Sequence, residues 1–308
     1  MATGSLILLY AGGIAVTLAF AAHVAHAVLL AQGRVAAARL VLRPEPAFAG
    51  IASGSFVDRQ VAGPAGDEPS SSARPFAIGF TWTAIALIGL SMAMRAVVVG
   101  RGPWGNLFEF SVAFAFTITL GYALLARRYP IRSIGFVALA VALALLLYAM
   151  TLPNEIEPLV PALENKPLLT LHVGLATIAY GIFATSFAAG VGYLVQGRTD
   201  RFAWLPSHRV LDEVAYRAVI VGFPIFATMI ILGSWWASIA WSRYWGWDPK
   251  ETAALVTWLV YAVYLHARNQ RSWAGRPAAL LLVVGFGMVL VTYSGSLWFS
   301  GLHAYSGL

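Results

Sequence analysis

The residues best suited to bind a ligand are concentrated between positions 235 and 251. This stretch holds five of the chain's 11 tryptophans, which are Trp235, Trp236, Trp241, Trp245 and Trp247. Indole rings bury a large area against flat apolar groups and keep an N–H group for hydrogen bonding. Tryptophan also gathers at membrane surfaces, where it forms an aromatic belt spread over many helix ends. On composition alone, the stretch fits either a platform for a large, flat, apolar ligand or part of a belt.

Two histidines have the chemistry to bind iron beside these tryptophans. His172 and His303 lie near ends of apolar segments that the topology described below places on the same side of the membrane as the tryptophans. Two neutral imidazoles on one iron are a common haem axial arrangement. Taken singly, either is better explained as an interfacial histidine. His266 lies near the end of its apolar segment that faces the other side of the membrane. An ionisable residue at membrane depth is a functional candidate.

Other polar residues have structural explanations. His23 and His26 are three positions apart on one face of the first apolar segment, which favours helix-packing hydrogen bonds. Asp248, Pro249 and Glu251 match the N-cap, first and third positions of a capping box. The sequence therefore predicts a helix that begins at Pro249, directly after the tryptophan cluster.

Membrane-spanning helices are the elements that must position these residues. A spanning helix needs about 20 apolar residues, and eight runs qualify, of which the seventh is the weakest. The runs are Leu6–Leu30, Phe76–Val98, Leu107–Leu125, Ser133–Met150, Thr170–Val195, Ala218–Ser234, Thr252–Ala267 and Ala278–Phe299. We expect an all-α, polytopic integral membrane bundle that forms a single domain over residues 1–308.

Composition supports a membrane protein and excludes other classes. Hydrophobic residues make up 59% of the 308 positions and charged residues only 11%, with a mean hydropathy of +0.75. A soluble domain is usually about 25% charged. The net charge of +7 does not indicate nucleic-acid binding, because the basic residues form short clusters between apolar runs. The chain has no cysteine, so any thiol chemistry must use the sulfur of another protein.

The distribution of Lys and Arg predicts the orientation. Three quarters of the 20 basic residues lie in alternate loops, which the positive-inside rule places in the cytoplasm. Both termini then lie outside a bacterial inner membrane or its equivalent. No basic residue precedes the first apolar run, so we expect a retained helix and not a cleaved signal. Residues 33–75 are predicted to form a flexible cytoplasmic loop, and residues 235–251 an external one.

Several segments together resemble one known family. The residues from Trp241 to Thr252 resemble the tryptophan-rich WWD signature of haem-handling membrane proteins, and their Asp-Pro-Lys-Glu ending is similar to the CcsA branch, also called ResC. Further similar segments follow in the family's order: Asn106-Leu107-Phe108-Glu109, Pro161-Ala162-Leu163 before His172-Val173, Tyr264-Leu265-His266 and Gly301-Leu302-His303-Ala304-Tyr305. The chain departs from the family pattern at three places: Ser242 replaces a glycine, Ala253-Ala254 replaces Trp-Ala, and Asn165-Lys166-Pro167 precedes the first external histidine.

The resemblance implies a subunit of the system II cytochrome c synthase, which carries haem b across the membrane and attaches it to apocytochrome c. In that scheme His266 binds iron at an inner site together with a histidine of the partner subunit CcsB (ResB). His172 and His303 then hold the iron outside, and the 235–251 loop, including Asp248, holds the porphyrin. There the two thiols of a Cys-x-x-Cys-His segment add to the haem vinyl groups. Thioredoxin-like proteins that reduce these thiols are further expected partners.

The outer cations nearest to the tryptophans, Arg243 and Lys250, are predicted to pair with the haem propionates. Three other interpretations stay open on the sequence: a haem b electron-transfer subunit, a small-solute permease and a scaffold without haem. Paired ligands at matching depth on facing helices are typical of the first, and broken helices with polar residues at the midplane are typical of the second. A scaffold would purify without haem.

Overall fold

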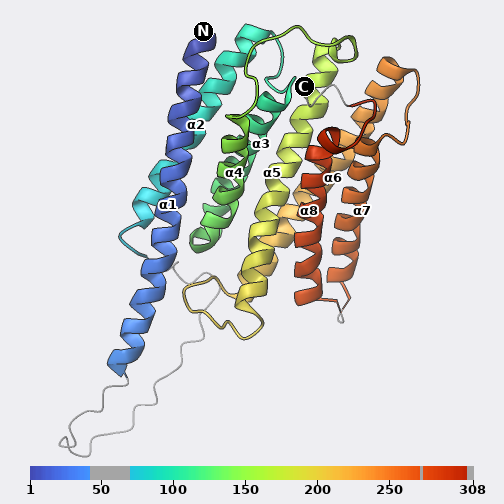
Figure 1. Ribbon diagram of the computed structural model, residues 1–308. Coiled ribbons are helices and arrows are strands. Elements are labelled where there is room, and N and C mark those ends of the chain that lie inside the picture. Colours follow the sequence, from blue (N-terminus) through green and yellow to red (C-terminus); the bar gives the residue numbers. More distant parts are fainter. Residues whose placement is uncertain (42–69, 271–272, 304–308) are drawn as a thin grey trace, which may run out of the picture.

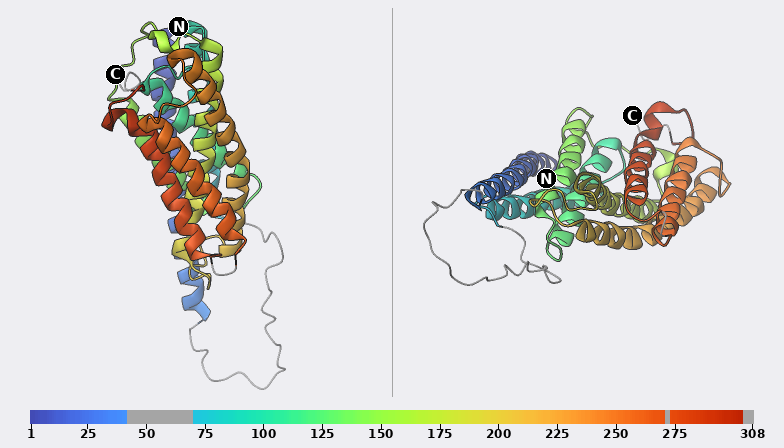
Figure 2. Two further views of the ribbon diagram at one scale, coloured as in Figure 1. Left: turned by 90° about the vertical axis from the view of Figure 1, so that its right-hand side faces the viewer. Right: turned by 90° about the horizontal axis from the view of Figure 1, so that it is seen from below.

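Eight α-helices make up most of the part of the chain that the computed structural model describes, which is residues 1–41, 70–270 and 273–303. They run side by side and form an elongated bundle (Figure 1, Figure 2). The helices are α1 (Ala2–Val41), α2 (Arg74–Val99), α3 (Leu107–Ala126), α4 (Gly135–Ala149), α5 (Lys166–Gln196), α6 (His208–Trp241), α7 (Pro249–Arg268) and α8 (Arg276–Trp298), with short 3-10 turns η1 (Arg132–Ile134) and η2 (Pro161–Leu163) between them. The predicted all-α membrane bundle is confirmed.

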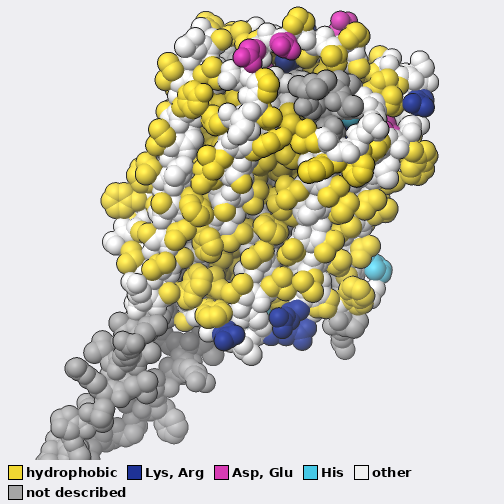
Figure 3. Space-filling model, viewed as in Figure 1, with side chains coloured by type: hydrophobic (Ala, Val, Ile, Leu, Met, Phe, Trp, Pro, Cys, Tyr) yellow, Lys and Arg dark blue, Asp and Glu magenta, His cyan; other side chains and the backbone are white. Residues whose placement is uncertain are grey.

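Seven of these helices are long and apolar enough to cross a membrane, and α7 is the exception. Its first turn contains Lys250 and Glu251 and its last turn His266 and Arg268, which shortens its apolar middle. It nevertheless packs lengthwise against α8 and α6. Figure 3 shows an apolar band around the visible face, with Lys and Arg side chains along its lower edge.

The start of α1 and the end of α8 lie at the same end of the bundle (Figure 1). We call this the outer end, following the charge bias, and the end with η1 the inner end. The predicted loop 33–75 needs a correction at both edges. α1 continues to Val41 through an alanine-rich segment of high helix propensity, and α2 begins at Arg74. Residues 42–69 of that predicted loop lie outside the described residues.

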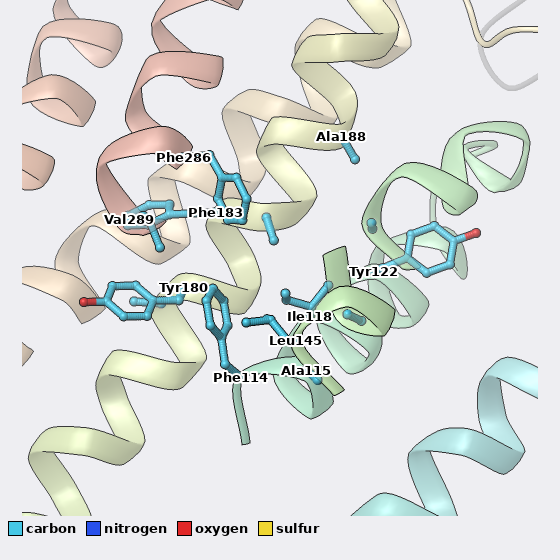
Figure 4. Close-up of a cluster of buried hydrophobic side chains, with 14 of the residues drawn as sticks. Phe114, Ala115, Ile118, Tyr122, Leu145, Tyr180, Phe183, Ala188, Phe286 and Val289 are labelled. Carbon is cyan, nitrogen blue, oxygen red and sulfur yellow. The ribbon is translucent and has the colours of Figure 1, made fainter. Parts of the chain in front are cut away.

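Close packing of α3 against α5 forms the centre of the bundle. A Cβ at Gly181 would lie 2.5 Å from the carbonyl carbon of Thr117, so the two backbones meet where glycine is present. The Thr117 hydroxyl also donates to the carbonyl of Thr177 at 2.7 Å. Figure 4 shows the aromatic side chains of this core, to which α8 contributes as well: Phe114, Tyr122, Tyr180, Phe183 and Phe286. This core forms the floor beneath the outer end.

Candidate functional site

A cavity of about 1000 Å³, counting its open mouth, lies at the outer end between α3, α5, α6, α7 and α8. Both His172 and His303 line it, and Tyr180 of the core lines it too. The fold thus brings together two histidines that are far apart in the sequence.

His172 reaches the cavity from the second turn of α5. Its Nδ1 lies 2.9 Å from the carbonyl oxygen of Met229 on α6, so Nδ1 carries the hydrogen and Nε2 keeps a lone pair. Nε2 has no hydrogen-bond partner among the described residues. Gly233 permits this approach, because a Cβ there would lie 2.6 Å from Cε1 of His172. The ring is therefore held by one nitrogen and has the other for a ligand.

His303 reaches the cavity from the segment after α8. Its Nδ1 lies 2.8 Å from Oδ2 of Asp248, and 16% of its side chain is exposed. Asp248 is also the N-cap of α7, and with Glu251 it forms the predicted capping box. Burial opposes ionisation of Asp248, but hydrogen bonds from His303 and from the Lys250 and Leu302 N–H groups lower its pKa to about 2. Asp248 is therefore a carboxylate at neutral pH and accepts the hydrogen of Nδ1.

The predicted external loop 235–251 is wrong over much of its length. α6 continues to Trp241 and α7 begins at Pro249, which leaves only residues 242–248 as a loop. No glycine or proline interrupts α6 between Trp235 and Trp241, so the helix continues. It ends at Ser242, whose φ of 56° is left-handed. A residue with a Cβ pays about 1–2 kcal/mol for that conformation, which explains the glycine of the resembling family.

Two of the tryptophans pack directly against the two histidines. Trp236 lines the cavity, is 4% exposed, and donates from Nε1 to the carbonyl of Ala162 at 2.9 Å. Its ring meets His172 edge-on, with 5.5 Å between ring centroids. Trp241 meets His303 in the same way at 5.0 Å. Each imidazole plane is therefore supported by an indole.

The residues around this pair divide between the cavity and the surface. Trp245 and Lys250 line the cavity. Trp235 and Trp247 are 55% and 70% exposed and do not belong to the lining, and Arg243 is exposed as well. Consecutive helical side chains point about 100° apart, which places Trp235 on a different face from its buried neighbour. The structure thus brings Lys250, and not Arg243, to the predicted site.

Trp104 is a cavity residue that was not predicted from the sequence. It lies in the connection between α2 and α3, and its Nε1 is buried without a hydrogen-bond partner among the described residues. Gly174 of α5 gives it room, since a Cβ there would lie 3.1 Å from the indole. The Gly102 N–H donates to the Thr170 hydroxyl at 3.0 Å and fixes the connection to α5. The available signal was a lone tryptophan in an outer connection just before the family-like segment at 106–109.

A buried carboxylate fixes the same connection from its other side. The fully buried oxygens of Glu109 accept hydrogen bonds from Arg95 Nε, Arg101 Nη1 and the Gly105 N–H, each at 2.7 Å. A buried carboxylate is tolerated when it is paired and hydrogen-bonded in this way. The cluster therefore acts as a clamp on the loop that carries Trp104.

His266 lies at the opposite end of the molecule from the cavity. It is exposed in the last turn of α7, with Nε2 2.8 Å from Nε2 of Gln270. It does not line the outer cavity. The structure therefore separates His266 from His172 and His303, in agreement with the inner position that the sequence predicts for it.

The predicted helix-packing role of His23 and His26 is confirmed. Nδ1 of His23 lies 3.0 Å from the Arg132 carbonyl and its Nε2 lies 3.3 Å from the Thr81 hydroxyl, while Nδ1 of His26 lies 2.7 Å from the Ser71 hydroxyl. These contacts join α1 to α2, to the turn just before α2 and to η1. α1 packs on α2 and α4, whereas α7 packs on α6 and α8 at the other side of the bundle (Figure 2). His23 and His26 on α1 are therefore not beside His266 on α7.

Residues 104–303 match the family described as the cytochrome C assembly protein. The matched region contains every residue named above as lining the cavity, from Trp104 to His303. The chain is an integral membrane protein that belongs to this family.

Within that family the chain is similar to proteins named cytochrome c biogenesis protein CcsA. It is 34% identical to the protein of Synechococcus elongatus over 284 residues, which covers 74% of this chain and 87% of the relative. It is 33% identical to that of Prochlorococcus marinus over 251 residues, covering 71% and 81%, and 32% identical to that of Guillardia theta over 262 residues, covering 76% and 87%. The resemblance to CcsA is therefore confirmed, and the chain is a haem-handling protein of cytochrome c biogenesis.

Proposed function

We propose that this chain binds haem b in the outer cavity, with His172 and His303 as axial ligands, and presents it to apocytochrome c for thioether attachment. One observation carries the proposal: two imidazoles from distant parts of the sequence line one cavity, each with Nδ1 on an acceptor of the protein. That tautomer makes Nε2 the ligand nitrogen on both rings. Two histidine ligands are an ordinary axial set for haem iron.

The rest of the lining fits a porphyrin. Trp104, Trp236 and Trp245 offer aromatic walls to a flat apolar ring. The buried N–H of Trp104, which has no hydrogen-bond partner within the described ranges, and the ammonium group of Lys250 are donors suited to the carboxylates of haem. Arg95 and Arg101 pair with Glu109 and do not line the cavity, whereas Lys250 does, so we assign a haem propionate to Lys250.

The contribution of this chain to the chemistry is placement. Bound haem supplies two vinyl groups, and each thiol of a Cys-x-x-Cys-His segment adds across one of them, so that a C–S bond forms and the thiol hydrogen ends on the neighbouring carbon. The histidines fix the iron and the indoles fix the ring, which holds the vinyl groups where the thiols arrive. The chain has no cysteine that would compete for them.

The inner histidine gives this proposal a second part. His266 lies on the same exposed face of α7 as Val263 and Leu259, which are 49% and 46% exposed. A second membrane subunit can therefore approach this face and add the second ligand to iron. We assign that role to a histidine of CcsB, so that haem enters at His266 and leaves from the outer cavity.

Absorption spectra of the purified chain, with and without CcsB, test the proposal. Wild type is expected to show a bis-histidine haem spectrum, which His172→Ala and His303→Ala each convert to a spectrum with one protein ligand. Loss of signal only in His266→Ala would place the haem at the inner site instead. A haem-free wild type in both preparations would overturn the proposal and favour a scaffold.

A further inference from the structure

Asp248 makes more contacts than a helix cap requires. Its Oδ2 accepts from the Lys250 N–H at 3.0 Å, which caps α7. The same oxygen accepts from Nδ1 of His303, and Oδ1 accepts from the Leu302 N–H. Its side chain is only 2% exposed. One carboxylate thus joins the start of α7 to a segment more than 50 residues further along the chain.

A glycine makes room for the contact between Asp248 and the segment before His303. A Cβ on Gly301 would collide with Oδ1 of Asp248 and lie 3.0 Å from Cδ of Pro249. Glycine is therefore needed at position 301 for its space, because the segment before His303 passes directly over the carboxylate. Helix capping alone would not require this glycine, since a capping box uses only the first turn of its own helix.

The two candidate ligands consequently have different partners. Nδ1 of His172 donates to a neutral backbone carbonyl, whereas Nδ1 of His303 donates to a carboxylate. A carboxylate that accepts from Nδ1 fixes the tautomer and the ring plane, and it raises the basicity of the coordinating nitrogen Nε2. A carbonyl fixes the tautomer with a weaker effect on basicity.

We infer that Asp248 is a positioning residue that holds His303 with Nε2 toward the cavity and makes it the stronger donor of the two iron ligands. This inference rests on the proposed function, because it concerns His303 as a ligand. Stronger donation stabilises ferric haem, so Asp248 lowers the midpoint potential of the bound haem and slows haem loss.

Asp248→Asn tests this role while keeping the helix cap, since asparagine caps as well as aspartate. An amide NH2 at the Oδ2 position would face both Nδ1 of His303 and the Lys250 N–H, whereas at the Oδ1 position it would face the Leu302 N–H. In either orientation His303 no longer donates to a carboxylate. We expect haem transfer to apomyoglobin to become about 10–100-fold more favourable, the usual cost of losing such a partner. We also expect the midpoint potential to rise.

Glu251→Gln is the matched control, because it neutralises the other carboxylate of the same capping box. Glu251 contacts the Gly246 and Asp248 N–H groups and makes no hydrogen bond to either histidine. Its effect on potential and haem transfer should be well below that of Asp248→Asn. Asp248→Ser, which also caps a helix but has no carboxylate, should reproduce the Asn result and serves if the Asn variant does not fold.

The outcomes distinguish failure of the role of Asp248 from failure of the proposed function. If wild type binds haem, His303→Ala changes its spectrum, and both Asp248 variants match wild type in potential and haem transfer, the inference is overturned and the proposed function stands. Equal shifts in Glu251→Gln and Asp248→Asn would also overturn it, because charge loss alone would explain them. A haem-free wild type overturns both.

Discussion

At the outer end of the bundle, His172 and His303 line a cavity and each donates from Nδ1 to an acceptor of the protein. At the inner end, His23 uses both of its ring nitrogens, one on the Arg132 carbonyl and one on the Thr81 hydroxyl. Both ring nitrogens of His23 therefore face oxygens of the protein, and His23 does not line the cavity. His23 is also more buried, at 1% exposed, whereas His172 and His303 are partly exposed where they line the cavity.

The outer end repeats this contrast with its two buried carboxylates. The Glu109 oxygens accept hydrogen bonds from Arg95, Arg101 and a backbone N–H, which neutralises the charge of Glu109 and fixes a loop. Asp248 instead accepts a hydrogen bond from His303, a side chain that lines the cavity. Two carboxylates at the same end thus serve different purposes, which follow from whether their partners are cations or a ligand residue.

Replacing the histidines in pairs should separate the two ends most widely. His172→Ala with His303→Ala is expected to weaken haem retention by more than about 100-fold, because losing only a partner of a ligand costs about 10–100-fold. His23→Ala with His26→Ala should keep the haem spectrum and lower the Tm, since each buried group left unpaired costs about 1–3 kcal/mol. Absorption spectra and thermal unfolding of the purified variants measure both. Equal haem loss in the two double variants would show that the comparison is wrong.

The space around His172 can be tested without touching a ligand. Gly233→Ala adds a Cβ 2.6 Å from Cε1 of His172, so the imidazole must move from the Met229 carbonyl. Losing a hydrogen-bond partner of a metal ligand costs about 10–100-fold in affinity. Because this variant only displaces the bond, we expect haem retention to weaken by roughly 10-fold. Gly287→Ala on α8 is the matched control, as its Cβ meets nothing within 4 Å. Similar haem retention in the two variants would remove Gly233 from the site.

The sequence predicted the helices well because apolar length and caps are local properties. The capping box placed the start of α7 at Pro249, where the structure has it. The shared location of His172 and His303 at one end followed from counting spans and needed no tertiary knowledge. Local signals thus determine the number of helices and the end to which each residue belongs.

Local sequence patterns did not predict the finer arrangement of the site. The tryptophans were predicted to lie in one loop, but α6 extends to Trp241, and helical geometry then separates Trp235 from Trp236. The bond between Asp248 and His303 was hidden because the helix cap already explained the aspartate. Contacts between distant segments depend on how helices pack, and a single sequence does not state them.

The two residues predicted to pair with the haem propionates, Lys250 and Arg243, should differ in their effect on haem. Lys250→Ala removes the ammonium group from the cavity and is expected to weaken haem retention about 10-fold, since hydrogen bonds to charged groups contribute about 1.5–3 kcal/mol. Arg243→Ala changes an exposed side chain outside the lining and should have less than about a 2-fold effect, as for exposed ion pairs. Haem titration at low and high salt measures both. A larger loss in Arg243→Ala would mean that the loop closes over the haem when it binds.

The smallest effect is expected where α6 turns into the loop of residues 242–248. Ser242 has a left-handed φ of 56°, which costs a residue with a Cβ about 1–2 kcal/mol. Ser242→Gly removes that cost but adds freedom to the unfolded chain, about 0.4–1 kcal/mol, so the net gain is roughly 0.5–1 kcal/mol. A rise in Tm of about 2 °C, with an unchanged haem spectrum, is the expected result. Ser242→Ala keeps the Cβ and should give no such rise. If both variants behave alike, the strain at Ser242 is relieved by its surroundings, and the glycine of the resembling family serves the approach of a ligand and not the turn.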